Sequence, residues 1–165
     1  MGVTAVDLVD ETWIAAAPET VAAVAHDPAR WRLWWPDLDL VVFQDRGTAG
    51  LRWSCTGALV GSCELWLEPW GSPAFGPGVL VHHYLRADPT RRGSRTEPVS
   101  GLPVRKAVAL RDRRARAWKV AVHAWKDELE AGRVLGPPDP HPADAMADPA
   151  PSPSRHRPQV PTTPG

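Results

Sequence analysis

Two ionisable residues stand at positions where the sequence predicts an otherwise apolar surface, His83 and Arg111. His83 alternates with Val79, Val81 and Leu85 along one side of a strand-like run, where it is the one ionisable group. An imidazole titrates near neutral pH, so it can act as a general base or anchor a ligand. Arg111 interrupts the apolar stripe of a long amphipathic helix, where a guanidinium could bind the carboxylate or phosphate end of an apolar ligand.

Each of these residues also has a structural interpretation. His83 could be a core histidine bonded to a backbone carbonyl or to water, and we favour this interpretation. The reason is that the sequence shows no nearby Asp or Glu on the same face to orient it as a catalytic pair requires. Arg111 could be solvated where the helix extends past the sheet. No residue is therefore assigned as catalytic, and His83 is the candidate that a catalytic hypothesis would use.

Tryptophan is the most unusual component, with nine residues against one Tyr and two Phe. Trp53, Trp118 and Trp125 are predicted to face the space between a sheet and the long helix. They could line a pocket for an apolar, planar ligand, or they could simply fill the core. The predicted ligand-binding set is Trp53, Leu65, Val81, His83, Arg111, Trp118, Val122 and Trp125.

The elements that position these residues begin with a strand over Ala5–Ala16 and a short helix over Pro18–His26. Asp27 is a suitable N-cap for a second short helix, with Pro28 at its first position and Pro36 at its end. This second helix carries three tryptophans, and we expect them to close one end of the barrel, with one of them partly exposed: Trp31, Trp34 and Trp35.

Four further strand-like runs alternate between apolar and polar residues, as expected for an antiparallel sheet with one wet side. They are Leu38–Gln44, Leu51–Thr56, Ser62–Glu68 and Val79–Ala87. Thr90–Pro103 is polar and basic and is predicted to be a loop, and Val104–Ala131 is predicted to be one amphipathic helix. These elements make an α+β domain.

Composition limits the classes of function. The chain has 165 residues with 19 basic and 19 acidic side chains, so its net charge does not attract nucleic acid to the whole molecule. We expect no transmembrane segment, no signal peptide, no cofactor and no metal, and a cytoplasmic location. Cys55 and Cys63 are too few for a disulfide scaffold. A hairpin centred on Leu59 would place them opposite each other, and we expect buried free thiols there.

Ten of the 19 prolines lie between Gly136 and Gly165, a stretch without an aromatic residue or a periodic apolar pattern. Such a segment cannot bury enough apolar area to offset the entropy of ordering its backbone. The predicted organisation is therefore a folded domain over residues 1–135 and a disordered proline-rich tail over residues 136–165.

The order of elements resembles the SRPBCC superfamily, the START-like helix-grip fold, and in particular the actinobacterial branch often called polyketide cyclase/dehydrase. The residues that carry the resemblance are VDET (Val9–Thr12), AAPETVAA (Ala16–Ala23), DPARWRLWWPDL (Asp27–Leu38), RWSCTGALVG (Arg52–Gly61), LWLEP (Leu65–Pro69) and HHYLRADPT (His82–Thr90). The resemblance implies a curved antiparallel sheet wrapped on the long C-terminal helix. Since Thr90–Pro103 occupies the place of a further hairpin, the fold is expected to be shorter by about one hairpin.

Three hypotheses about function follow. The first, implied by the resemblance, is binding or transport of a hydrophobic small molecule, lipid or polyketide-like, between the sheet and the C-terminal helix. The second is a polyketide cyclase or aromatase that uses His83 and Arg111 to polarise a carbonyl. The third is an interaction module, because Arg86–Arg116 holds ten basic residues against three acidic ones. We do not expect nucleic acid as the partner of that segment, because no recognition motif accompanies it.

Overall fold

The computed structural model describes residues 4–131. The predicted proline-rich tail and the predicted domain boundary at residue 135 lie outside the described residues. Within them, the elements are β1 (Val6–Ile14), α1 (Pro18–Ala25), α2 (Pro28–Trp34), β2 (Leu38–Asp45), a short 3₁₀ turn (Gly47–Ala49), β3 (Gly50–Gly57), β4 (Leu59–Pro69), β5 (Val79–Pro89) and α3 (Val104–Glu130).

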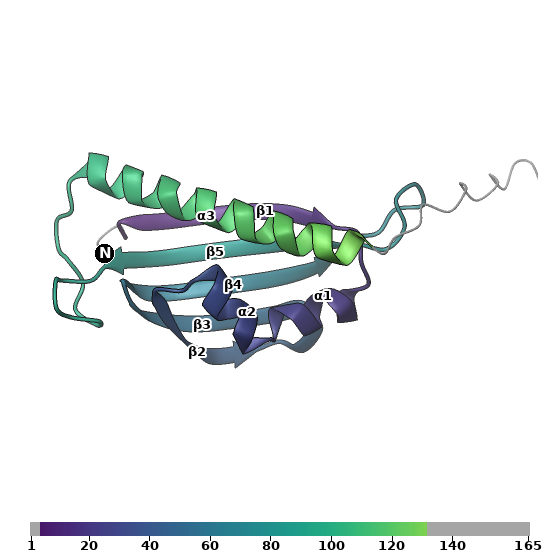
Figure 1. Ribbon diagram of the computed structural model, residues 1–165, viewed down its shortest axis with the longest axis horizontal. Helices are drawn as coiled ribbons and strands as arrows, with labels where there is room; N and C mark the ends of the chain where they lie inside the picture. The colour runs from purple at the N-terminus through teal and green to yellow at the C-terminus, as the bar shows by residue number, and fades with distance from the viewer. Residues whose placement is uncertain (1–3, 132–165) are drawn as a thin grey trace, which may run out of the picture. The chain divides into compact units, whose positions relative to one another are not determined.

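The five strands form one antiparallel sheet in the order β1-β5-β4-β3-β2. Strands β2 to β5 are connected as successive hairpins, and β1 pairs with β5. The long helix α3 runs along one face of this sheet, and the short helices α1 and α2 cover the same face beside it (Figure 1). The predicted α+β helix-grip arrangement is confirmed.

The alternation along the strands decides which side chains face the helix. On the inner face the apolar positions of β3, β4 and β5 are buried, as predicted: Leu51, Trp53, Cys55, Cys63, Leu65, Leu67, Val79, Val81, His83 and Leu85. A single cluster joins these side chains to α2 and to the C-terminal half of α3. The core is thus the layer between the sheet and the helices.

The predicted pairing of the two cysteines is wrong, because the turn is centred one residue earlier and each cysteine faces a residue two positions away from the other cysteine. Cys55 lies opposite Gly61 and Cys63 lies opposite Trp53, so the turn is centred on Ala58. Gly57, with a φ of 111°, provides the positive backbone angle just before this turn. Both cysteines are buried free thiols, and burial raises the pKa of Cys55 to about 11.

The segment between β5 and α3 contains no strand among the described residues, only an isolated bridge between Thr90 and Pro98. The expectation of a helix-grip fold shortened by one hairpin is therefore confirmed. This segment is held to the end of the sheet by backbone bonds: Gly57 N donates to Arg95 O at 2.8 Å and Val99 N to Pro89 O at 2.8 Å.

Helix α2 begins as the sequence predicts. The Asp27 carboxylate accepts a hydrogen bond from Ala29 N at 2.8 Å, and Pro28 occupies the first turn. This cap matters beyond the helix, because a helix of seven residues has little intrinsic stability of its own. The helix nevertheless has to present Trp34 and Trp35 to the core.

Replacing Asp27 by Ala removes this cap, and we expect the free energy of unfolding to fall by about 1 kcal/mol. Asp27→Asn keeps a side-chain oxygen in the same place, so it is the matched control and should stay within a few tenths of a kcal/mol of the wild type. Urea unfolding followed by tryptophan fluorescence measures both. Equal losses in the two variants would mean that the cap bond does not stabilise α2.

Candidate functional site

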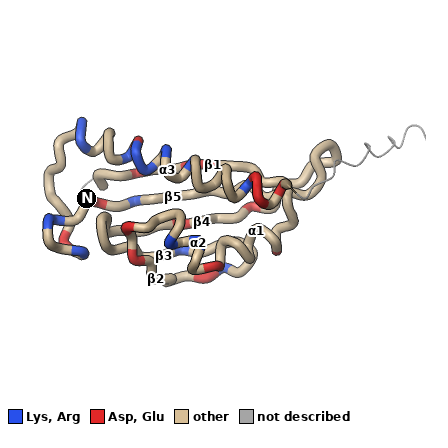
Figure 2. The backbone as a smooth tube through the Cα atoms, viewed as in Figure 1, with Lys and Arg blue, Asp and Glu red and all other residues tan. Residues whose placement is uncertain are grey.

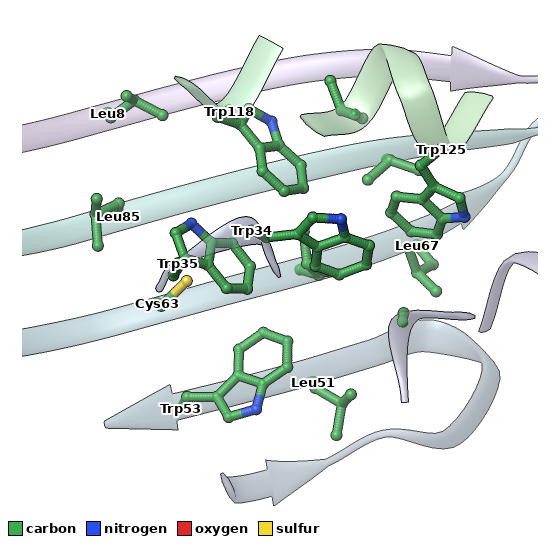
Figure 3. Close-up of a cluster of buried hydrophobic side chains, with 14 of the residues drawn as sticks. Leu8, Trp34, Trp35, Leu51, Trp53, Cys63, Leu67, Leu85, Trp118 and Trp125 are labelled. Carbon is green, nitrogen blue, oxygen red and sulfur yellow. The ribbon is translucent and has the colours of Figure 1, made fainter. Parts of the chain in front are cut away.

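The space between sheet and helix is occupied by a layer of indole rings (Figure 3). Trp35, the C-cap residue that follows α2, stacks on Trp118 from α3 with centroids 5.4 Å apart, and Trp34 from α2 stacks on Trp125 at 5.0 Å. Trp53 from β3 completes the layer, 5.9 Å from Trp35. We call these five residues the indole layer. Leu65, Val81 and Val122, the other predicted apolar site residues, are also fully buried in the core.

Seven of the eight predicted site residues thus lie together in the core, packed against the indole layer. That they contact a ligand stays a prediction. A ligand among them would require the indole rings to move apart, because their ring centroids already lie 5–6 Å from one another.

Trp31 is the one tryptophan of α2 that remains partly exposed, in agreement with the sequence prediction. Its indole N–H donates to Ala25 O at 2.7 Å, and its ring meets Trp53 edge-on at 5.2 Å. It lines a hollow of about 430 Å³ together with residues of α2 and β2 that include Trp35, Leu38 and Leu40.

The indole N–H groups of the core differ in their partners. Trp118 Nε1 donates to an Asp10 carboxylate oxygen at 3.0 Å. Trp53 Nε1 and Trp125 Nε1 are buried and make no hydrogen bond. Leaving a buried donor unpaired costs about 1–3 kcal/mol. The layer therefore holds two buried N–H donors that have no partner among the described residues.

His83 is fully buried against this layer, with its ring 4.3 Å from that of Trp118. Its Nδ1 donates to the carbonyl oxygen of Glu64 at 3.3 Å. Burial lowers the pKa of His83 to about 4, so the ring is neutral at pH 7. A neutral imidazole bonded to a backbone carbonyl is the structural interpretation that the sequence favoured.

The sequence interpretation failed at Asp10, which it did not place beside His83. Asp10 pairs with His83 in the register of β1 and β5, and its side chain is only 15% exposed. Besides Trp118, it binds Lys119 Nζ at 2.6 Å. The signal was present, because Val6, Leu8 and Asp10 alternate on one face of β1 and the first two are buried.

Arg111 lies apart from the seven core residues. It is exposed, and its Nε and Nη2 donate to Asp112 at 3.0 and 2.7 Å. Trp118, which contacts His83, is seven residues further along the helix, a rise of about 10 Å. The structure therefore does not bring Arg111 and His83 to one reacting atom.

Arg111 instead lines a groove of about 610 Å³ beneath the first two turns of α3. Apolar and small side chains make most of its wall, with polar groups at its edge. The wall consists of Thr4, Ala5, Asp7, Asp88, Pro98, Val99, Ser100, Gly101, Leu102, Val104, Ala107, Val108 and Arg111. We call this hollow the α3 groove.

The α3 groove exists because the helix begins beyond the end of the core. The predicted stripe is buried from Trp118 to Trp125, whereas Val104 is 80% and Val108 40% exposed. This is the overhang that the structural interpretation of Arg111 described. Loop residues 98–102 form the second wall of the groove in place of a further hairpin.

A second hollow lies near the C-terminal end of α3. It has about 350 Å³ and is lined by Trp13, Trp70, Ser72, Phe75 and Leu80. Trp13 Nε1 donates to Trp70 O at 3.0 Å, and Lys126 Nζ lies 5.2 Å from the centre of the Trp13 ring. These contacts fix the β4–β5 loop, which leaves Trp70 and Phe75 exposed.

The outer face of the sheet holds a buried histidine that the sequence placed on the wet side. His82 stacks beneath Trp66 with centroids 4.3 Å apart. Its Nδ1 lies 3.1 Å from a Glu11 carboxylate oxygen and its Nε2 3.0 Å from one of Glu68. The ring thus links three strands. Among residues 4–131 no cluster of His, Cys, Asp and Glu could hold a metal ion.

Comparison with known proteins yields similarity in solved structures alone. No protein-family model and no curated protein sequence matches the chain. A protein of Deinococcus radiodurans has a TM-score of 0.49 at 14% identity, covering 77% of this chain and 99% of its own. A START superfamily protein of Mycobacterium smegmatis has a TM-score of 0.43 at 14% identity, and the match covers 74% of this chain and 98% of that protein. An aromatase/cyclase of a Streptomyces species has a TM-score of 0.38 at 12% identity, and the match covers 78% of this chain and 98% of that protein.

These similarities assign no function to this chain. Its described residues contain no helix that is long and apolar enough to cross a membrane.

The two helix tryptophans of the core provide a matched pair of substitutions. Trp118→Phe and Trp125→Phe remove the same atoms from fully buried positions, but only Trp118 loses a hydrogen bond to a carboxylate. We expect Trp118→Phe to lower the free energy of unfolding by about 1–2 kcal/mol more than Trp125→Phe does. Chemical denaturation measures the difference, and equal losses would contradict the assigned roles of the two N–H groups.

His83 predicts a dependence of stability on pH. Its pKa is about 4 in the folded protein and 6.5 when unperturbed, so the unfolded chain takes up the proton first as the pH falls. The free energy of unfolding therefore falls by about 1.4 kcal/mol per pH unit as the pH drops from about 6.5 to 4. Above that range this group does not change it.

His83→Gln removes this titration and isolates it from that of the carboxylates. We expect the stability of the wild type to fall more steeply than that of the variant from pH 7 to 4.5, by a total of about 2–3 kcal/mol. Urea unfolding of both proteins at several pH values gives the comparison. Parallel pH profiles would show that His83 is not held neutral by burial.

Proposed function

We propose that this chain binds a small, largely apolar molecule with an anionic end in the α3 groove. The observation that carries the proposal is the groove itself, about 610 Å³ with mostly apolar walls and a guanidinium at its edge. Pockets for small molecules commonly have about 300–1,000 Å³ and few polar groups. A polyketide-like or lipid-like molecule has this chemistry.

Arg111 can bind an anionic end although two carboxylates also line the groove. Asp7 accepts from Arg86 Nε at 3.3 Å, and Asp88 accepts from Ala5 N at 2.7 Å, so both carboxylates are engaged. Arg111 uses Nε and Nη2 for Asp112, and Nη1 makes neither of these bonds. A ligand carboxylate, sulfonate or phosphate can therefore bind Arg111 without breaking its existing contacts.

The predicted core residues have a supporting part in this proposal. Trp118 and its neighbours hold the C-terminal half of α3 on the sheet, which keeps the first turns of the helix over the groove. Arg111 is the residue shared by the sequence prediction and the proposed site.

Binding without turnover is favoured over the cyclase hypothesis. A carbonyl in the groove would meet Arg111, but the neutral, fully buried His83 lies among the core rings two helical turns away. General acid–base catalysis needs a group within hydrogen-bond reach of the substrate. We therefore propose a carrier or sensor rather than an enzyme.

The groove offers a matched pair of substitutions for a binding test. Ala107 lines it, whereas Ala109 is exposed on α3 and does not. The probe is 1-anilinonaphthalene-8-sulfonate, whose apolar rings carry one anionic group. We expect Ala107→Trp to fill the groove and weaken the probe's affinity at least about tenfold, while Ala109→Trp leaves it unchanged. Fluorescence titration measures both, and equal effects of the two variants would contradict this site.

The same titration tests the anionic end. Dodecanoate and dodecanol, which differ in their head groups, are used to displace the probe. We expect Arg111→Gln to weaken dodecanoate about tenfold and dodecanol little, because only the carboxylate uses the guanidinium. A loss of the same size for both molecules would show that Arg111 does not select the charge.

A further inference from the structure

We propose that the end of the molecule around the α3 groove docks on a lipid bilayer surface that carries anionic headgroups. This goes beyond the proposed function, because the surface would bind such a bilayer whether or not the groove holds a ligand. The proposal rests on the distribution of unpaired cations, on the apolar side chains among them, and on the lack of aromatic side chains there.

Positive charge is concentrated at this end although the chain as a whole is neutral. Basic residues gather on the first turns of α3 and on the loop that follows β5 (Figure 2), and the groove lies beneath the same turns of α3. Between Arg86 and Arg116 ten basic residues face three acidic ones. A field of one sign at one end orients a protein toward an oppositely charged surface.

Several of these cations have acidic partners within the protein. Arg95 pairs with Asp39, and Arg114 with Asp37 at 2.6 Å. A second group makes no ion pair with any residue that the structure describes and is exposed: Arg92, Arg105, Lys106 and Arg116. This second group, which we call the free cations, is available to an external anionic surface.

Apolar side chains lie among the free cations. Val104 is 80% exposed and immediately precedes Arg105 and Lys106, and Leu102 is half-buried at the rim of the groove. Exposed apolar side chains flanked by cations suit the boundary between headgroups and acyl chains, where both kinds of side chain find a favourable environment. A bilayer therefore matches this surface better than a purely anionic partner does.

The same segment lacks the features that bind nucleic acid. Between Arg86 and Arg116 there is no Trp, Tyr, Phe or His on which a base could stack. The observations thus favour the bilayer, and a nucleic acid becomes the alternative outcome of the test.

The test is co-sedimentation of the full chain with phosphatidylcholine vesicles that contain or lack phosphatidylserine. We expect binding to the anionic vesicles alone, and a decrease in binding as salt is added. Arg92→Gln, Arg105→Gln and Lys106→Gln combined should weaken the partition coefficient about a hundredfold, since each basic residue near such a surface contributes about fivefold.

Arg32→Gln is the control, because Arg32 is exposed on α2, outside the basic segment, and should leave vesicle binding unchanged. The free energy of unfolding of the triple variant is also measured by urea unfolding with tryptophan fluorescence, which shows whether it folds. Equal binding to both kinds of vesicle, or an unchanged partition in the folded triple variant, would overturn the proposal. So would binding of the full chain to single-stranded DNA without binding to the anionic vesicles, which would identify a nucleic acid as the partner.

The outcomes separate the two proposals. Vesicle binding that fails while the groove still binds the probe removes only the membrane surface. If the wild-type protein binds vesicles but does not bind the probe, only the proposed ligand site is removed.

Discussion

The contact on which the rest of the structure depends is the stacking of α2 against α3 through their tryptophans. Trp35 lies on Trp118 with the ring planes 6° apart, and Trp34 lies on Trp125 at 30°. Four large rings thus join a seven-residue helix to a 27-residue helix above the sheet. Because each aromatic side chain buries about 150–250 Å², this contact fills the volume between the helices and the sheet.

How far the sequence predicts this arrangement depends on the range of the interactions concerned. Alternation along β3, β4 and β5 predicts the inner face correctly, and the cap of α2 follows from Asp27 and Pro28, because these signals are local. The register of Cys55 and Cys63 was missed, since it depends on which residue centres the turn. The α3 groove could not be predicted, because it depends on where the helix begins relative to the ends of the strands.

Asp10 shows how a polar residue inside the grip is accommodated. Its carboxylate receives both the Trp118 N–H and the Lys119 ammonium, so its charge is compensated from α3. His83, directly across the strand pair, has a carbonyl for a partner and remains neutral. No face was predicted for the polar residues of β1, so the partner that two-residue periodicity places beside His83 was missed.

These interior contacts explain why the candidate site lies beneath the first turns of α3 rather than between the sheet and the rest of the helix. In the C-terminal half of α3 the apolar stripe packs in the indole layer. Its polar side chains bind Asp10 and the carbonyl oxygen of Trp13 near the end of β1. The N-terminal half continues the stripe beyond the core, and its valines face a groove whose other walls are the ends of β1 and β5 and loop residues 98–102. Residues there are free of packing constraints and can carry cations that a buried helix could not tolerate. The first turns of α3, which lie beyond the indole layer, thus form the surface on which both proposals rest.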